Sequence, residues 1–305
     1  MAGYLLRRLL AAFVVVWAAA TALFVLIRLS GNPAAILIDP TATREQYEAL
    51  LKYYGLDQPV HIQYITFLTQ LLQGDLGQSF LHNQPTVDLL LGRFPATAQL
   101  AFSALFLAVV IAVPVGILSA VRRNSWLDYG AAAFATVAQS MPNYWLGVVL
   151  ILFFAVEFRL LPTSGQGGLQ HLVLPAVTLA LGPMAKYLRL TRSEMLGVLQ
   201  QDYIRTARAK GVTERQIEFR HALRNSSIPL VTIIGTDISS LLGGAIIVET
   251  VFSWPGIGSL LMNAVSHRDY PMVQATVLAI TVIVVVTNLL VDILYGYLDP
   301  RIRLT

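Results

Sequence analysis

Ionisable residues inside otherwise apolar stretches are the first candidates for chemistry. Asp237 and Glu249 interrupt the stretch from about 228 to 252, and Asp292 ends the stretch that begins at Tyr270. A carboxylate in the middle of a lipid-facing helix would cost at least about 2.5 kcal/mol. Asp237 should therefore face a cavity, a bound solute or a partner side chain. A structural ion pair explains Asp237 at least as well, and Glu249 and Asp292 are better explained as structural anchors.

A second polar group accompanies a proline in the stretch from Tyr129 to Val156. Ser140, Pro142 and Asn143 lie near its middle. Pro142 should kink a helix there and leave a backbone carbonyl without its usual donor. Such a kink could line a cavity or simply aid helix packing, and the sequence leaves both open.

Several kinds of catalytic and metal site are missing from the sequence. No lysine follows a glycine, so there is no Gly-Lys-Ser/Thr, and a phosphate-binding loop of that type is excluded. No Gly-x-Ser-x-Gly occurs, and no two of the five histidines stand three or four positions apart. Helical metal-ligand spacing is therefore absent, and the zero cysteine count excludes disulfides and Cys-ligated metals.

The composition is that of an integral membrane protein. Hydrophobic residues make up 56% of the 305 positions and charged residues only 12%, whereas a soluble domain is about a quarter charged. The net charge of +4 is not clustered as on a protein that binds nucleic acid. The sequence therefore predicts an all-α membrane protein.

Six stretches are long enough for membrane helices, which need about 20 residues. They are Leu9–Ile27, Phe94–Val121, Tyr129–Val156, a helix from near Leu169 past Lys186, about 228–252, and Tyr270–Val291. The N-terminal stretch is too long for the apolar part of a signal peptide, so we expect a retained helix.

The orientation follows from the lysines and arginines. With six spans, fifteen of them lie on the side that holds both termini and the segment 186–224, and six on the other side. Positive charge marks the cytoplasmic side, so both termini should be cytoplasmic. The loop 30–94 should then lie outside, as an ordered cap of short helices that either packs on the helix ends or docks a partner.

The cytoplasmic segment predicts two helices that meet at a corner. Asp202–Gly211 reads as a short helix with a glycine C-cap, and Thr213–Gln216 fits a capping box that opens a second helix. Tyr203 and Ala207 share one face of the first helix and could engage a partner. Binding of anionic lipid is the simpler role for a basic loop, but it does not require such a corner.

The corner resembles the cytoplasmic loop of ABC importer permeases. Of that loop's general pattern only Ala207, Gly211 and Leu223 are kept, but Asp202–Gly211 and His221–Asn225 match the "DY-RTARAKG" and "HALRN" of the dipeptide/oligopeptide/nickel branch. Further segments resemble the same branch: Tyr54–Pro59, Gly74–Gly77, Leu241–Gly258, Arg268–Pro271 and Asp299–Arg301. The resemblance covers nearly the whole chain.

The resemblance implies a type I permease with six transmembrane helices and a cytoplasmic coupling helix. Such a subunit forms the pathway for peptides across the bacterial inner membrane with a second homologous permease. Two ATP-binding subunits, identical or paired, would hold ATP and Mg, so this chain would bind no cofactor and no metal and would not itself be an ATPase. An extracytoplasmic substrate-binding protein would deliver the substrate, lipid would surround the helices, and no nucleic acid is involved.

The resemblance, together with the positions of polar and gate-forming residues within the predicted spans, gives candidate residues for three roles. The candidates for coupling to the ATPase are Tyr203, Arg205, Thr206, Ala207, Arg208 and Gly211; those for the translocation pathway are Asp237, Asn143 and Ser140; those for an outer gate are Glu249, Trp254, Pro255 and Gly256.

The chain would divide into an N-terminal helix with its outer loop (1–93), a five-helix permease core (94–299) with the coupling loop at about 195–225, and a cytoplasmic tail (300–305). Nickel, a metal chelate or glutathione are alternative substrates. A secondary transporter is disfavoured because no internal repeat is visible, and a membrane enzyme because the intramembrane acids are isolated.

Overall fold

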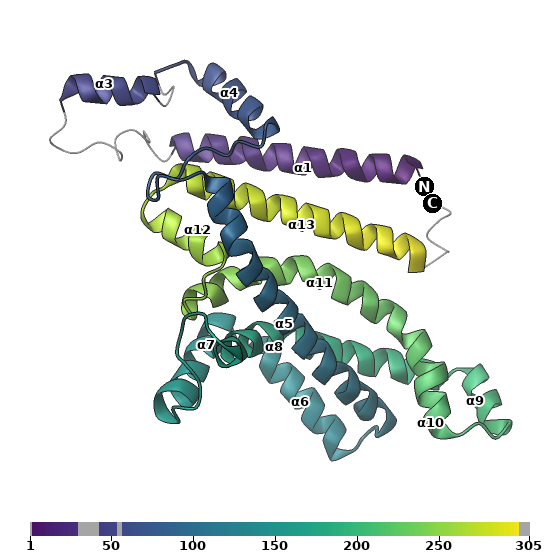
Figure 1. The fold of residues 1–305 in the computed structure, drawn as a ribbon. Coiled ribbons are helices and arrows are strands. Elements are labelled where there is room, and N and C mark those ends of the chain that lie inside the picture. The colour runs from purple at the N-terminus through teal and green to yellow at the C-terminus, as the bar shows by residue number, and fades with distance from the viewer. Residues whose placement is uncertain (1, 30–42, 54–56, 299–305) are drawn as a thin grey trace. The chain divides into compact units, whose positions relative to one another are not determined.

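Helices form all the long elements of the residues that the computed structural model describes, which are 2–29, 43–53 and 57–298 (Figure 1). The predicted all-α fold is confirmed. The Tyr54–Leu56 part of one matching segment, Asp299–Arg301 and the predicted tail 300–305 lie outside the described residues. The helices are α1 (Ala2–Leu29), α3 (Arg44–Tyr53), α4 (Val60–Leu72), α5 (Thr86–Val121), α6 (Trp126–Ser140), α7 (Asn143–Leu150), η1 (Ile151–Glu157), α8 (Leu169–Leu199), α9 (Asp202–Ala209), α10 (Glu214–Gln216), η2 (Ile217–Ala222), α11 (Leu223–Val251), α12 (Ile257–Ser266) and α13 (Tyr270–Leu298).

Five helices are long and apolar enough to cross a membrane, namely α1, α5, α8, α11 and α13. The pair formed by α6 and α7–η1 meets the same criteria when it is taken together, which allows up to six spans among the described residues. The start of α8 at Leu169 is as predicted. Helix α5 begins at Thr86 and contains the whole predicted stretch Phe94–Val121.

The predicted third span is broken rather than kinked. The axes of α6 and α7–η1 differ by 105°. Met141 has an extended backbone (φ −86°, ψ 124°), and Pro142 precedes α7 with ψ 136°. The residue before a proline is disfavoured in the α conformation, and Pro142 also has a non-helical backbone. Two consecutive non-helical residues change the direction of the chain much more than the loss of one helical hydrogen bond would.

The structure divides into two compact units, which are described separately. The first comprises residues 1–95 and 256–286, and the second comprises 96–255 and 287–305. These packing units differ from the predicted division at 93/94 because the first also contains α12 and the first part of α13. The sequence-based domain boundaries stay predictions.

In the first unit, α4 packs on α1. The Tyr64 and Phe67 rings lie against Phe24, with centroids 5.1 and 5.7 Å away, and the Tyr64 hydroxyl is 2.7 Å from that of Thr21. The buried carboxylate of Asp269 accepts hydrogen bonds from Ser79 and from the Phe80 and Leu81 amides. The segment between α4 and α5 is thereby held to the turn before α13.

In the second unit, α8 packs most extensively against α11 and α6. Small residues let α5 join this core, because Ala104, Ala108 and Ala112 are fully buried along one side of it. Gly116 continues this row, and a Cβ atom there would lie 2.7 Å from Thr191 Cβ and 2.9 Å from the Leu188 carbonyl oxygen of α8. The α5–α8 packing therefore needs glycine at position 116.

Gly116→Val is expected to lower the free energy of unfolding by about 1–3 kcal/mol, because its side chain must displace α8 backbone. Gly92→Val is the matched control, since Gly92 is an exposed position on the same helix and a Cβ atom there would meet nothing within 4 Å. The measurement is the thermal unfolding midpoint of the purified protein in detergent. Equal midpoints for the two variants would contradict the close α5–α8 packing.

Candidate functional site

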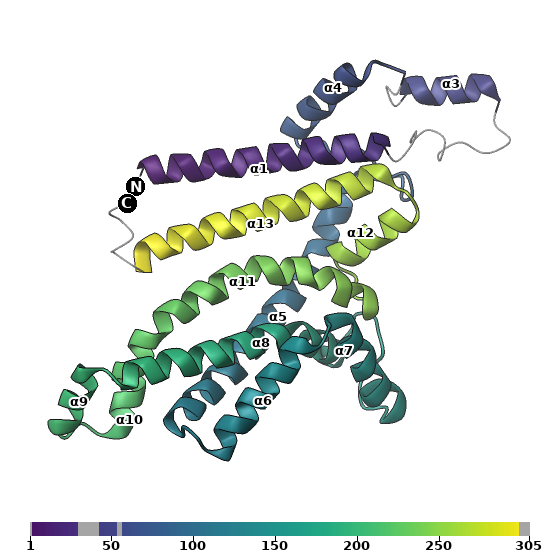
Figure 2. The same cartoon turned by 180° about the vertical axis from the view of Figure 1, so that it is seen from behind.

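The corner that follows α8 has the predicted helix and glycine cap. Helix α9 ends at Ala209, and Gly211 has φ +78°. The Gly211 amide donates to the Arg208 carbonyl at 2.9 Å and the Val212 amide to the Ala207 carbonyl at 3.2 Å. These two bonds make a Schellman motif, which uses the left-handed backbone that glycine adopts without strain. Figure 2 shows α9 and α10 at the ends of α8 and α11.

The second half of the corner starts at the predicted residue but without the predicted capping box. Thr213 is the N-cap of α10 by its backbone, with ψ 146°, yet its side chain makes no capping hydrogen bond. Glu214 instead turns back to α9, where the Arg208 Nε and Nη2 atoms donate to its two oxygens at 2.8 and 3.1 Å. This bond lowers the pKa of the Glu214 carboxyl, so the bridge between α9 and α10 is charged at neutral pH.

Helix α9 is attached to the second unit through one face. Ile204 is fully buried, as is Ile217 at the start of η2, and α9 packs on η2. Tyr203 is exposed, but its hydroxyl accepts a hydrogen bond from Asn225 Nδ2 at 2.9 Å. Arg205, Thr206 and Arg208 are exposed and Ala207 is half-buried. The six coupling candidates thus form one exposed corner, and their contact with an ATPase subunit stays a prediction.

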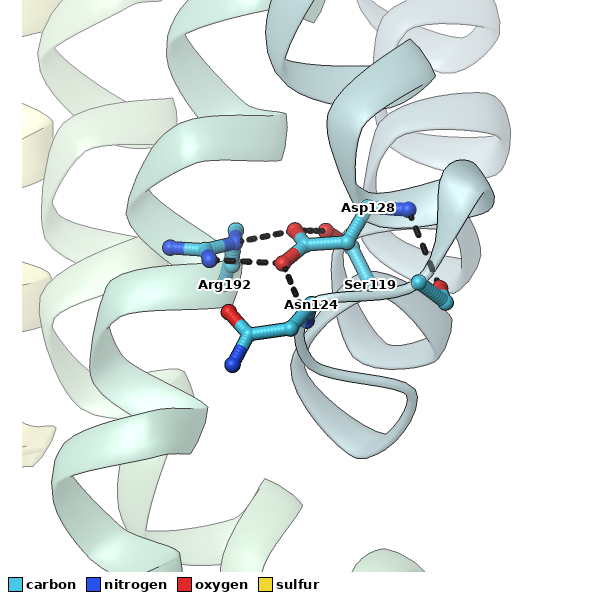
Figure 3. Close-up of polar contacts among 5 residues, drawn as sticks. Ser119, Asn124, Asp128 and Arg192 are labelled. Carbon is cyan, nitrogen blue, oxygen red and sulfur yellow. Dashed lines mark hydrogen bonds and ion pairs between the residues drawn. The ribbon is translucent and has the colours of Figure 1, made fainter.

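An ion pair that sequence reasoning missed lies between α6 and α8 (Figure 3). Asp128 is 2% exposed, and its two oxygens accept from Arg192 Nε at 2.5 Å and Nη2 at 2.8 Å. The Ser119 hydroxyl and the Asn124 amide donate to the same carboxylate. The only local signal was Ser125, the N-cap of α6, which accepts a bond from the Asp128 amide and so marks the start of the helix but not the partner.

Asp237 has both kinds of neighbour that the sequence allowed, a partner side chain and a cavity, and its role in a translocation pathway stays a prediction. Its Oδ1 atom lies 2.7 Å from Lys186 Nζ of α8, so it has an ion-pair partner on another helix. Both residues also line a cavity of about 290 Å³. Asn143 also lines this cavity, and a pathway role for Asn143 and Ser140 stays a prediction. The Ser140 hydroxyl instead donates to the Thr136 carbonyl of its own helix.

The outer-gate candidates lie at a tightly packed end of α11. Glu249 is fully buried, and the Thr97 hydroxyl donates to it at 2.6 Å. Trp254 is 1% exposed, and its Nε1 atom donates to the Ala96 carbonyl at 2.9 Å. Pro255 is half-buried, and the buried Gly256 is the N-cap of α12. These contacts anchor the end of α11, as expected for Glu249, and a gating role for the four residues stays a prediction.

Across residues 2–29, 43–53 and 57–298 no three His, Asp or Glu side chains gather in a way that could hold a metal ion. Two groups of charged side chains remain as candidates, namely the exposed corner between α9 and α10 and the Lys186–Asp237 pair beside the cavity. Such side chains can bind charged or hydrogen-bonding groups of a partner or a solute.

Comparison with known proteins places these features in a family. The family model described as "Binding-protein-dependent transport system inner membrane component" matches residues 112–304, and the model of its N-terminal part matches residues 1–101. The chain is 40% identical to the oligopeptide transport system permease protein AppB of Bacillus subtilis (strain 168), over 99% of this chain and all of that protein. It is 39% identical to the glutathione transport system permease protein GsiC of Escherichia coli (strain K12), over 99% of both chains.

A solved structure has the same fold. An inward-facing structure of the MetNI methionine ABC transporter contains a chain that matches with a TM-score of 0.60 at 22% identity, over 70% of this chain and 97% of that one. This likeness supports the helical permease fold and, at that identity, the fold alone. The family matches along the sequence and the two relatives at 39–40% identity over nearly the full length show that the chain belongs to the inner-membrane permease components of binding-protein-dependent ABC importers.

Proposed function

We propose that this protein is the permease subunit of an ATP-driven importer that carries peptides across the cytoplasmic membrane. The observation that carries the proposal is the 40% identity, over essentially the full length, to an oligopeptide permease. The exposed α9–α10 corner supports it, because a short helix that is held at its base by Ile204 and capped by Gly211 can transmit motion from a partner to α8 and α11.

The remaining parts of the transporter belong to the same proposal. A second homologous permease completes the pathway, two ATP-binding subunits hold ATP and Mg, and an extracytoplasmic protein delivers substrate. Both termini and the corner are cytoplasmic, as the distribution of lysine and arginine predicts. Glutathione is a second candidate substrate because a glutathione permease is 39% identical. Nickel has weaker support, since no metal-ligand cluster occurs within the described residues.

The test is uptake by cells that lack their own peptide importers and express this chain together with a second permease, ATPase subunits and a binding protein from the same genome. Labelled dipeptide, oligopeptide, glutathione and Ni²⁺ are offered separately. ATP-dependent uptake of a peptide, lost when this chain is omitted, is the expected result. Uptake of Ni²⁺ alone would contradict the peptide assignment, and no uptake of any of the four would contradict the proposal as a whole.

The purified chain without its partners is expected to hydrolyse ATP no faster than a detergent blank, because it has no Gly-Lys-Ser/Thr loop. The complete transporter serves as the positive control, and its ATPase activity should rise when substrate-loaded binding protein is added. Sustained turnover by the isolated chain, at a rate that scales with its concentration, would contradict the assignment of ATP hydrolysis to the partners.

A further inference from the structure

The Lys186–Asp237 pair combines a fixed negative charge with a movable positive charge. The Asp237 side chain is 11% exposed on α11, whereas the Lys186 side chain is 43% exposed on α8. Lysine carries its ammonium on a flexible four-carbon stem, so the ammonium can leave Asp237 by rotation of the stem without movement of either helix. The carboxylate has no such freedom, because it sits on a short and mostly buried side chain.

The cavity beside the pair has a lining suited to a small polar organic molecule. Its volume of about 290 Å³ is near the lower end of the range of small-molecule pockets, about 300–1,000 Å³. Gln139, Asn143 and Ser240 contribute amide and hydroxyl groups, and Leu179 and Leu241 contribute apolar surface. The break between α6 and α7 places Gln139 and Asn143, from two different helices, along the same cavity.

A backbone acceptor lies close to this charge pair in the chain. Pro183 lies within α8 and also lines the cavity. Because proline has no N–H, the Leu179 carbonyl of α8 lacks its usual helical donor. The fixed carboxylate of Asp237 and this segment of α8 together favour a ligand that brings hydrogen-bond donors.

We infer that this cavity is a binding site for the zwitterionic backbone of a short peptide, with Asp237 for its α-ammonium group and Lys186 for its carboxylate. The inference rests on the proposed function and specifies its substrate class. When a peptide enters, its ammonium replaces Lys186 at Asp237, and the released Lys186 ammonium pairs with the peptide carboxylate. Each charge has a partner before and after the exchange, and the buried Asp237 carboxylate avoids the large penalty of an unpaired charge away from water.

The charge balance of the site discriminates between substrate classes. The pair is formally neutral, so a zwitterion can enter without leaving net charge in the cavity. A divalent cation prefers several anionic or imidazole ligands. Among the described residues that line this cavity it would find only the Asp237 carboxylate, with the Lys186 ammonium 2.7 Å from that carboxylate, so the site disfavours a free divalent cation. The amide groups of Gln139 and Asn143 match peptide groups, which both donate and accept hydrogen bonds.

The experiment uses the complete transporter in proteoliposomes and the double variant Lys186→Gln/Asp237→Asn. This variant removes both charges but keeps side chains that can hydrogen-bond to each other. The probe is a labelled dipeptide that carries a photoreactive side chain. We expect peptide uptake to fall about fivefold or more, in line with the loss of about 1 kcal/mol or more of binding, and photolabelling of the cavity-lining helices α6–α8 and α11 to fall by a similar factor.

The control is Thr236→Ala, next to Asp237 but with a side chain that is exposed and bonded to its own helix, and it should retain both uptake and labelling. Unchanged uptake and labelling in an assembled double variant would overturn the inference while leaving the peptide importer intact. A purely structural pair would instead lower the yield of complex and leave uptake per complex unchanged, which also overturns it. If the unmodified transporter takes up no peptide, the proposed function itself has failed.

Discussion

We expect Gly211→Val to abolish peptide uptake while the transporter still assembles in the membrane. Gly211 has φ +78°, and a Cβ atom there would meet nothing within 4 Å. The penalty is therefore conformational and not steric: a β-branched residue resists the left-handed backbone on which both Schellman bonds depend. When the cap opens, α9 loses its angle to α10, and the corner can no longer transmit movement from a bound partner.

Gly211→Asn is the matched control, because asparagine is the side chain other than glycine that most readily adopts this backbone at a helix end. It should retain most of the uptake. Ala207→Glu tests the surface of the same corner, because it places a long charged side chain at a half-buried position of α9. This variant should also abolish uptake. The measurements are ATP-dependent uptake and co-purification of the ATPase subunits. If the valine and glutamate variants transport at the unmodified rate, α9 does not couple to the ATPase.

Arg192→Gln should lower the free energy of unfolding by about 1–3 kcal/mol, the range for a buried group that loses its hydrogen-bond partner, because Asp128 is buried whereas the Arg192 side chain is 31% exposed. The reason is that Asp128, which is 2% exposed, would keep its charge without the two guanidinium bonds at 2.5 and 2.8 Å. Ser119 and Asn124 would still donate to it, but two neutral donors do not compensate for the charge.

A double-mutant cycle separates this penalty from the net value of the pair. Asp128→Asn/Arg192→Gln removes both charges and should recover most of the lost stability. Arg189→Gln, an exposed arginine on the same helix, is the matched control and should stay within about 0.5 kcal/mol of the unmodified protein. Thermal unfolding of the purified protein in detergent gives the four stabilities. Additive effects of the two single substitutions would show that Asp128 and Arg192 do not interact.

The Asp128–Arg192 pair lies close in the chain to the α9–α10 corner, because α8 ends at Leu199 and α9 begins at Asp202. Arg192 fixes the last two turns of α8 to the start of α6 through Asp128. A loosened base would let α9 move without moving the rest of the second unit. The stability measurement is therefore best accompanied by an uptake measurement on the same variants.

The features that the sequence alone determined depend on near neighbours or on total hydropathy. Uncharged stretches of about 20 residues can be stable only in lipid or in a helical core, so five long spans and the bent pair could be located in advance. Gly211 could be assigned as a helix cap because the requirement for a left-handed backbone is local. Long segments such as Asp202–Gly211 also carried the family resemblance.

Tertiary structure alone decided which groups meet and how far the chain turns. Lys186 and Asp237 are 51 positions apart, and Asp128 and Arg192 are 64 apart, so no local pattern connects them. The sequence could show that Asp237 needs a partner or a cavity, but not that it has both. Pro142 indicated a disturbed helix, yet the 105° angle depends on how α6 and α7 each pack on α8. Ion-pair partners and helix angles depend on how surfaces that are distant in the sequence pack against one another. Local patterns of residues do not reveal this packing.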